Sequence, residues 1–170
     1  MKNKIETTGF VCAFPGCGKS TIHKNALEYG LYTANKDGYT IYPRTKTSLN
    51  NKIVYDSDSS TFDKSGFPDN YIAHMISILH REVPFPFLAL VSSHEEVRNA
   101  MKAKGIPYTL VYPDRSLKDE FIERYKVRGD SKSFIDLMDK NWDSFIDSCE
   151  KDTTYDKKIL KSGQFLKDVL

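Results

Sequence analysis

The feature that most constrains this chain is the stretch Ala-Phe-Pro-Gly-Cys-Gly-Lys-Ser-Thr at positions 13–21, directly after an apolar run. The pattern G-x-x-x-x-G-K-[ST] is typical of a strand-to-helix loop whose backbone N–H groups surround a phosphate, while Lys reaches the β/γ oxygens and the hydroxyl holds Mg²⁺. Ala13 stands at the first glycine position, which is acceptable if its φ is negative. The stretch predicts a nucleotide-phosphate site formed by Pro15, Gly16, Cys17, Gly18, Lys19, Ser20 and Thr21, with Ser20 as a Mg²⁺ ligand.

Apolar runs alternate with helical periods along the rest of the chain. Strands are expected at 9–14, 52–56, 85–91, 106–112 and 158–160, with helices between most of them. This alternation predicts an α/β fold with a parallel sheet covered on both faces and a ligand cleft beyond the carboxyl ends of the strands. The 170 residues and 39% hydrophobic content suit a single domain over 1–170.

Two carboxylates, Asp56 and Asp58, follow the second expected strand in the run Asp-Ser-Asp-Ser-Ser. In extended backbone they share a face, which suits Mg²⁺ or an acceptor hydroxyl. The alternative is an Asp/Ser-rich turn that caps the next helix. Beside a phosphate loop, we expect Asp56 to organise the metal and Asp58 to contact or deprotonate the acceptor.

Arg124 and Arg128 are four residues apart on the helix expected within 116–132. They project from one helix face, where both guanidinium groups can close over a transferring phosphoryl group. We therefore expect a lid at about 115–132. Because Glu120 lies four residues before Arg124, a solvated, salt-bridged helix is the alternative.

Two further basic residues are candidates for the acceptor side. Arg98 lies one turn into the helix after the third strand, where it either clamps an acceptor phosphate or pairs with Glu95 or Glu96. Residues 31–52 sustain no period and predict an insertion with a small hairpin, and their tyrosines and Arg44 suit a base and a phosphate. A packed surface hairpin is the alternative for that insertion.

Together, the loop, the Asp56-x-Asp58 pair and the Arg124-xxx-Arg128 segment resemble the nucleoside and nucleotide kinases of the P-loop superfamily. The nearest are small phage-type deoxynucleoside monophosphate kinase-like proteins, and the Asp-x-Asp tip is similar to that of shikimate and gluconate kinases. The resemblance implies a three-layer P-loop NTPase fold, a five-stranded parallel sheet of order 2-3-1-4-5, ATP with Mg²⁺ as donor and Lys19 on the β/γ-phosphates. The third strand ends in Val-Ser-Ser at 91–93, without the usual metal-binding aspartate, so that role falls to Asp56.

We therefore expect an ATP-dependent phosphotransferase acting on a nucleotide-type acceptor. Its catalytic residues would be Lys19, Asp58, Arg124 and Arg128. A kinase acting on a hydroxyl of DNA, either at an end or on a modified base such as 5-hydroxymethyluracil, is one alternative. A small-metabolite kinase and a non-catalytic nucleotide-binding regulator are the others. The net charge of +2 neither demands nor excludes a nucleic-acid partner.

The cysteines and the N-terminal residues indicate the cellular compartment of the protein. Cys12, Cys17 and Cys149 are odd in number and lack metal-ligand spacing, which favours a reducing cytosol. The apolar stretch near the N-terminus is too short for a membrane span or a signal peptide. We expect a cytoplasmic protein without a membrane partner.

Overall fold

The computed structural model describes residues 4–33, 52–80, 86–154 and 156–170. Within them, six strands form one sheet in the order β2-β3-β4-β1-β5-β6, and every neighbouring pair is parallel. The strands are β1 (Gly9–Ala13), β2 (Leu31–Thr33), β3 (Lys52–Asp56), β4 (Phe87–Ser92), β5 (Tyr108–Pro113) and β6 (Asp156–Leu160). The α-helices are α1 (Lys19–Lys24), α2 (Asp69–Leu79), α3 (Glu95–Ala103), α4 (Lys118–Arg128) and α5 (Lys132–Lys151).

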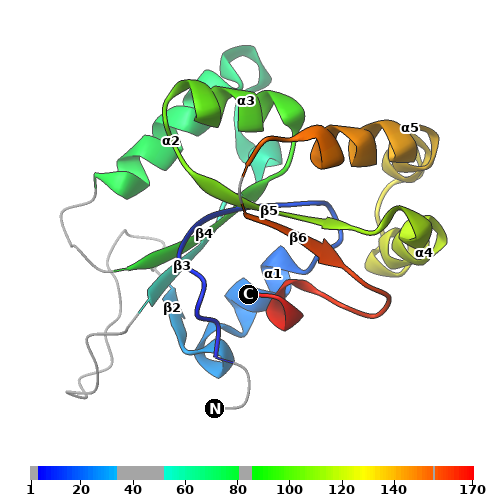
Figure 1. Ribbon diagram of the computed structural model, residues 1–170, viewed down its shortest axis with the longest axis horizontal. Helices are drawn as coiled ribbons and strands as arrows, with labels where there is room; N and C mark the ends of the chain where they lie inside the picture. Colours follow the sequence, from blue (N-terminus) through cyan, green and yellow to red (C-terminus); the bar gives the residue numbers. More distant parts are fainter. Residues whose placement is uncertain (1–3, 34–51, 81–85, 155) are drawn as a thin grey trace.

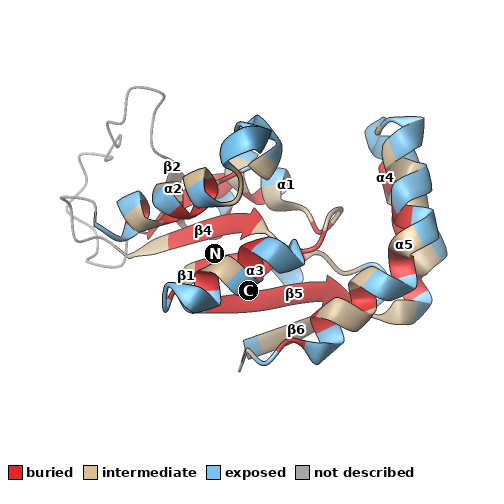
Figure 2. Cartoon of the chain, turned by 90° about the horizontal axis from the view of Figure 1, so that it is seen from above, coloured by how far each residue is buried: buried red, intermediate tan, exposed pale blue. Residues whose placement is uncertain are grey.

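The central strands are continuous apolar runs because helices and connecting segments cover both faces of the sheet. Cys12 of β1 pairs with Val91 of β4 on one side and Leu110 of β5 on the other, and all three side chains are buried. Figure 2 shows β1, β4 and β5 as the buried centre, with exposed positions on the outer faces of the helices. β1, β4 and β5 are therefore the most deeply buried strands, whereas β3 ends in the half-buried Tyr55 and Asp56.

The elements form three layers. In Figure 1, α2 and α3 lie on one face of the sheet, and α1 and the C-terminal segment lie on the other. α4 packs against α5 beside the end of β1. Since all strands are parallel, their carboxyl ends and the segments that follow them gather at one edge of the sheet.

The sheet differs from the expected five-stranded one. Leu31–Thr33 adds a sixth strand at the edge and pairs in parallel with β3, with Leu31 opposite Lys52. Tyr32 and Thr33 therefore belong to the parallel sheet. The prediction missed β2 because three residues are too few to show a period. The remainder of the expected insertion, including Arg44, lies outside the described residues.

Two helices also differ from their predicted bounds. The spacing of apolar residues after Lys19 predicts one helix to about Tyr29, but α1 ends before Asn25 and a 3₁₀ turn over Ala26–Tyr29 follows. The residue type of Asp69 predicts an N-cap, but Asp69 is the first helical residue of α2, with Pro68 at the N-cap. Gly30 ends the 3₁₀ turn with φ 72°, as a glycine at a helix end commonly does.

All three cysteines are free and buried. Burial raises the pKa of Cys17 to about 12 and that of Cys149 to about 11, so both thiols stay protonated near neutral pH. Among the helices in the described part of the chain, none combines the length and the apolar character that a membrane crossing needs.

Candidate functional site

The loop after β1 adopts the conformation that its glycines permit. Gly16 has φ 85° and Gly18 has φ 96°, values that favour glycine. Ala13, in contrast, is the last residue of β1 and pairs with Ser92 and Val111, so its backbone is extended. A glycine is therefore not required at position 13, and the departure of Ala13 from the motif carries no conformational cost.

Residues outside the loop donate hydrogen bonds to the loop carbonyls. Three successive ones accept hydrogen bonds: Pro15 from the Tyr125 hydroxyl at 2.9 Å, Gly16 from Arg124 Nη1 at 3.1 Å and Cys17 from the Leu166 amide at 2.9 Å. In a trans peptide the next N–H points away from the carbonyl, so fastening the carbonyls turns amides toward the opposite side. Within the described residues, the amides of Gly16, Gly18 and Lys19 have no hydrogen-bond partner. The Cys17 amide, between Gly16 and Gly18, donates to the Phe14 carbonyl at 3.3 Å. The successive free amides of Gly18 and Lys19 are groups of the kind that line an anion-binding concavity.

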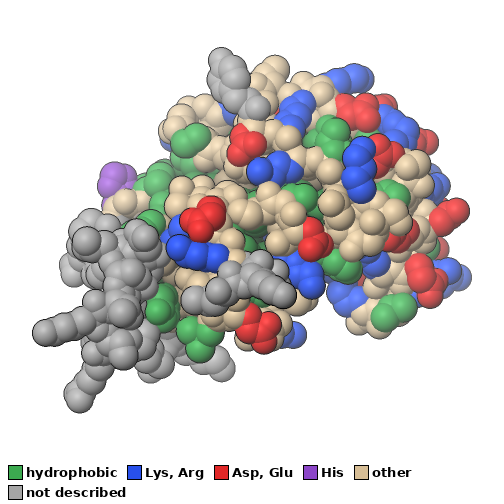
Figure 3. All heavy atoms as spheres, turned by 60° about the horizontal axis from the view of Figure 1, so that its bottom comes forward, with side chains coloured by type: hydrophobic (Ala, Val, Ile, Leu, Met, Phe, Trp, Pro, Cys, Tyr) green, Lys and Arg blue, Asp and Glu red, His purple; other side chains and the backbone are tan. Residues whose placement is uncertain are grey.

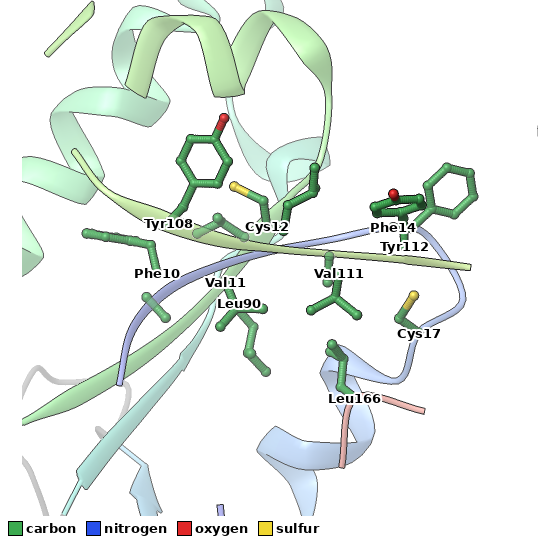
Figure 4. Close-up of a cluster of buried hydrophobic side chains, with 14 of the residues drawn as sticks. Phe10, Val11, Cys12, Phe14, Cys17, Leu90, Tyr108, Val111, Tyr112 and Leu166 are labelled. Atoms are coloured by element: carbon green, nitrogen blue, oxygen red, sulfur yellow. The ribbon is translucent and has the colours of Figure 1, made fainter. Parts of the chain in front are cut away.

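Close packing is a second reason for glycine in the loop. A Cβ on Gly16 would lie 2.8 Å from Tyr125 Cε1, and one on Gly18 would lie 3.3 Å from Phe165 Cδ1. Cys17, between them, lies with Leu166 on the opposite side of the sheet from Cys12 and Tyr108 (Figure 4). The core, α4 and the C-terminal segment thus surround the loop.

Lys19 lies beside the expected carboxylates. Its Nζ donates to the Ala13 carbonyl at 3.2 Å, which folds the side chain back over the loop. Burial lowers the pKa of Lys19, and the charges of Asp56 and Asp58 act against that shift. The helix that begins at Lys19, α1, packs against β3, the strand that ends at Asp56.

Asp58 has two roles in the structure. Its Oδ1 accepts from the Ser60 amide at 2.9 Å and caps the 3₁₀ turn over Ser59–Thr61, which is the turn-capping alternative. Asp58 is also exposed and lines a cavity of about 320 Å³ together with Asp56, the last residue of β3. A cap uses only one carboxylate oxygen, so Asp58 retains acceptor capacity toward this cavity.

Ser57, between the two carboxylates, fixes their turn. Its hydroxyl lies 2.9 Å from His74 Nε2, and its carbonyl accepts from the Tyr71 hydroxyl at 2.6 Å. The Tyr71 oxygen in turn accepts from the amide of Ser92 at the end of β4. Burial lowers the pKa of His74, which favours the neutral imidazole. Neither Tyr71 nor His74 was predicted to belong to the site. Their spacing of three residues, which places them on one helix face, was the signal in the sequence.

A larger groove adjoins these carboxylates. It has a volume of about 410 Å³ and is lined by Ser59, Ser60, Phe62, Lys64, Phe67, His94 and Glu96. Phe62 lines both this groove and the cavity of Asp56 and Asp58. His94 lines both the groove and a third cavity of about 160 Å³ that reaches Pro15 of the loop. Loop, carboxylates and groove are therefore neighbours at the carboxyl edge of the sheet.

The two arginines of the expected lid make different contacts in the structure. Arg124 donates to the carbonyls of Gly16 and Gln164, and its guanidinium lies 4.3 Å from the ring centre of Phe121 and 4.0 Å from that of Phe165. Arg124 also contacts Glu120 at 3.5 Å, as the salt-bridge alternative expected. In this structure Arg124 fastens the loop and does not point an open guanidinium into the phosphate concavity.

Arg128 is the more accessible member of the pair. Half of its side chain is exposed, and Nη2 lies 2.6 Å from Asp130. Its guanidinium also lies 5.5 Å from the ring centre of Tyr125 and 5.9 Å from that of Phe134. Gly129, the expected hinge, ends α4 with φ 83°.

Arg98 occupies neither of its two expected settings. It is 2% exposed and does not pair with Glu95 or Glu96. Its Nε donates to the Ser93 carbonyl at 2.8 Å, and its Nη atoms bond to Ser148 and Asp152. The guanidinium is held inside the protein because it balances a buried carboxylate, Asp152.

Ser20 and Asp56 supply the oxygen ligands that suit Mg²⁺. Ser20 is exposed in the first turn of α1, and Asp56 ends β3 on the side of the loop lysine. In phosphoryl-transfer sites, Mg²⁺ binds through one or two protein groups plus the substrate phosphates. No cluster of three or more His, Cys, Asp or Glu residues in the described ranges is arranged to hold a metal by itself. The donor set therefore fits Mg²⁺ carried with a nucleotide.

No model of a known protein family and no curated protein sequence matches this chain. The fold is an α/β fold with a single parallel sheet, and the site lies at the carboxyl edge of its buried strands.

Proposed function

We propose that this chain is an ATP-dependent phosphotransferase of the P-loop kinase type, acting on a nucleotide-type acceptor. The observation that carries the proposal is the loop with free amides at Gly16, Gly18 and Lys19 beside the carboxylates of Asp56 and Asp58. Amides and an ammonium group bind phosphates, and a carboxylate beside them receives an acceptor proton. One edge of the sheet thus combines both requirements of a kinase.

The residues divide the chemistry between them. The loop amides and Lys19 hold the donor phosphates and offset the charge that develops on them. Ser20 and Asp56 hold Mg²⁺, which when bound neutralises phosphate charge. Asp58 orients the acceptor and takes its proton. Arg128 is the arginine of the pair that we assign to the phosphates, because its side chain is half-exposed whereas Arg124 is bonded to the carbonyls of Gly16 and Gln164.

The face drawn in Figure 3 shows no concentration of basic side chains among the described residues, because basic and acidic side chains are interspersed on it. Extended nucleic-acid sites instead concentrate basic side chains along one face. This face therefore gives no support to DNA over a small nucleotide-type acceptor.

Replacing Lys19 with Ala tests the donor site. We expect phosphoryl transfer from γ-labelled ATP to fall by at least about 10²-fold, because a preorganised positive group at the developing charge is lost. Lys24, exposed on the same helix, provides the matched control as Lys24→Ala. Transfer is measured with ATP, Mg²⁺ and a panel of nucleosides, nucleotides, oligonucleotides and polyols.

Thermal unfolding with and without ATP completes this test. At 100 times the Kd, ATP should stabilise the native chain by about 2.7 kcal/mol, and Lys19→Ala should lose most of this gain. Equal transfer by Lys19→Ala and Lys24→Ala would refute the assignment of the loop. Stabilisation by ATP without transfer to any acceptor would instead favour a nucleotide-binding regulator.

A further inference from the structure

The charges around the expected acceptor position differ from those around the donor loop. The cavity of Asp56 and Asp58 and the adjoining groove share Phe62, so they are neighbours. Their lining includes three carboxylates, with Glu96 as the third, and Lys64 is the single Lys or Arg among the described residues that line them. Three histidines, His23, His74 and His94, also line them, and burial lowers the pKa of His74 and His94, which favours their neutral form. Among the described residues, the acceptor side is therefore acidic, whereas the donor loop presents amides and Lys19.

The best candidate for an acceptor-phosphate clamp is already used inside the protein. Arg98 is buried, and its three nitrogen atoms bond to Ser93, Ser148 and Asp152. Turning this guanidinium toward the groove would leave the buried Asp152 carboxylate without its main counter-charge. Arg98 therefore does not offset the acidic lining of the acceptor side.

An acceptor phosphate and an acceptor hydroxyl respond to this lining in opposite ways. A phosphate monoester carries a charge of about −1.5 to −2 at pH 7, which the three carboxylates repel. A hydroxyl is neutral and donates a hydrogen bond to a carboxylate, which is the geometry of proton removal. We infer that the group receiving the phosphoryl is a hydroxyl of a nucleoside-type compound and not the phosphate of a nucleotide. This inference rests on the proposed function.

The transfer step then balances with ATP as the sole co-reactant. The acceptor hydroxyl oxygen forms a bond to the γ-phosphorus as the bond from that phosphorus to the β,γ-bridging oxygen breaks. The bridging oxygen keeps the electron pair and leaves with ADP. The hydroxyl proton passes to the Asp58 carboxylate and then to water. The products are ADP and a phosphate monoester.

The groove also indicates the shape of the rest of the acceptor. Phe62 and Phe67 are half-buried, and both rings line the groove. Each also contacts Tyr71, at ring-centre distances of 4.8 and 5.7 Å, which fixes their positions. Fixed aromatic rings beside polar groups suit a flat heterocycle such as a nucleobase.

The chemical nature of the product tests the inference. The full chain is incubated with ATP and Mg²⁺ and with each of four probes: thymidine, thymidine 5′-monophosphate, and short oligothymidylates with a 5′-hydroxyl or a 5′-phosphate. Phosphorus NMR distinguishes a new monoester from a new phosphoanhydride, and only the monoester survives brief heating in dilute acid. We expect monoester formation from at least one probe and no anhydride.

Each alternative outcome has a distinct meaning. Anhydride formed on thymidine 5′-monophosphate or on the 5′-phosphorylated oligonucleotide would overturn the hydroxyl inference alone, because it would still show phosphoryl transfer. Formation of neither product from any probe would overturn both the inference and the proposed transfer. A monoester formed equally well by Lys19→Ala would show that the product does not come from this site.

Discussion

Two charged clusters of the molecule are built in opposite ways. The closed cluster joins Arg98 and Asp152, whose side chains are 3% and 1% exposed, with the Tyr108 hydroxyl at 2.8 Å from the carboxylate. Arg98 lines the small cavity that reaches Pro15, but its nitrogen atoms all donate to protein groups. The open cluster consists of the loop amides, Lys19, Asp56 and Asp58, and the two carboxylates line a cavity of about 320 Å³. In the closed cluster, each charged group already has its partners within the protein.

This difference separates structural charges from charges available to a ligand. A buried, fully partnered charge cannot bind a ligand unless it gives up a partner, at a cost of several kcal/mol. Free amides and a lysine at the edge of a sheet lose little when a phosphate arrives. We therefore expect changes in the closed cluster to lower stability and changes in the open cluster to lower transfer.

The largest expected effect is on the stability of an Arg98→Ala variant. Removing this guanidinium leaves the buried carboxylate of Asp152 uncompensated, which costs about 3–5 kcal/mol of unfolding free energy. Arg115→Ala is the matched control, because Arg115 contacts three carboxylates but its side chain is 38% exposed. Removing Arg115 from this exposed network should cost far less stability, because solvent screens its charges.

Urea unfolding monitored by the single, buried Trp142 measures both variants. If Arg98→Ala does not fold, Tyr108→Phe provides a milder change in the same cluster, with an expected loss of about 1 kcal/mol. Equal losses for Arg98→Ala and Arg115→Ala would contradict the distinction between the buried and the exposed network.

The next largest expected effect is on kcat, and it compares two 3₁₀ turns that are each capped by an aspartate. Asp58 accepts from the Ser60 amide and Asp63 from the Ser65 amide, each at 2.9 Å, but only Asp58 lines the cavity beside Asp56. Asn retains the capping oxygen but cannot take a proton from the acceptor. We expect Asp58→Asn to lower kcat by about 10²-fold and Asp63→Asn to leave it unchanged.

Steady-state transfer and the melting temperature of both variants separate catalysis from capping. Parallel, small losses of stability in the two variants would show that the cap survives the change in each turn. A kcat for Asp58→Asn equal to that of Asp63→Asn would reduce Asp58 to a turn residue and remove it from the open cluster.

The third effect is the response of the closed cluster to acid. Burial opposes ionisation of Asp152, but hydrogen bonds from Thr154, Arg98, Tyr108 and Lys102 lower its pKa from 3.8 to about 2. Between these values the unfolded chain binds more protons than the native one. The stability from Asp152, about 2 kcal/mol, is therefore present above pH 4 and is lost as the pH falls toward 2.

Unfolding free energies of the native sequence and of Asp152→Asn between pH 2 and pH 5 measure this contribution. The variant lacks the titrating carboxylate, so its stability should be lower at pH 5 and should depend less on pH in this window. The same slope in both proteins would show that other carboxylates cause the acid response.

The sequence predicted those features whose signals are local. The loop motif is continuous, and Asp56 and Asp58 directly follow an apolar run that forms β3. The roles of Arg98 and Arg124 were not predictable in the same way. Arg98 bonds to Asp152, 54 residues on, and Arg124 bonds to the carbonyl of Gln164, 40 residues on. Nothing near either arginine in the sequence distinguishes a group that fastens the fold from one that contacts a ligand.

The smallest effect tests whether the outside contacts of the loop matter for the open cluster. Tyr125→Phe keeps the ring that packs beneath Gly16 but removes the hydroxyl that donates to the Pro15 carbonyl at 2.9 Å. Losing one such bond costs about 1 kcal/mol, so the Kd for ATP should rise about fivefold if the hydroxyl orients the loop. Tyr112→Phe is the control, because the buried Tyr112 has no side-chain hydrogen bond in the described part of the chain. Equal ATP affinities of the two variants, measured by calorimetry, would mean that the loop holds its shape without the Tyr125 hydroxyl.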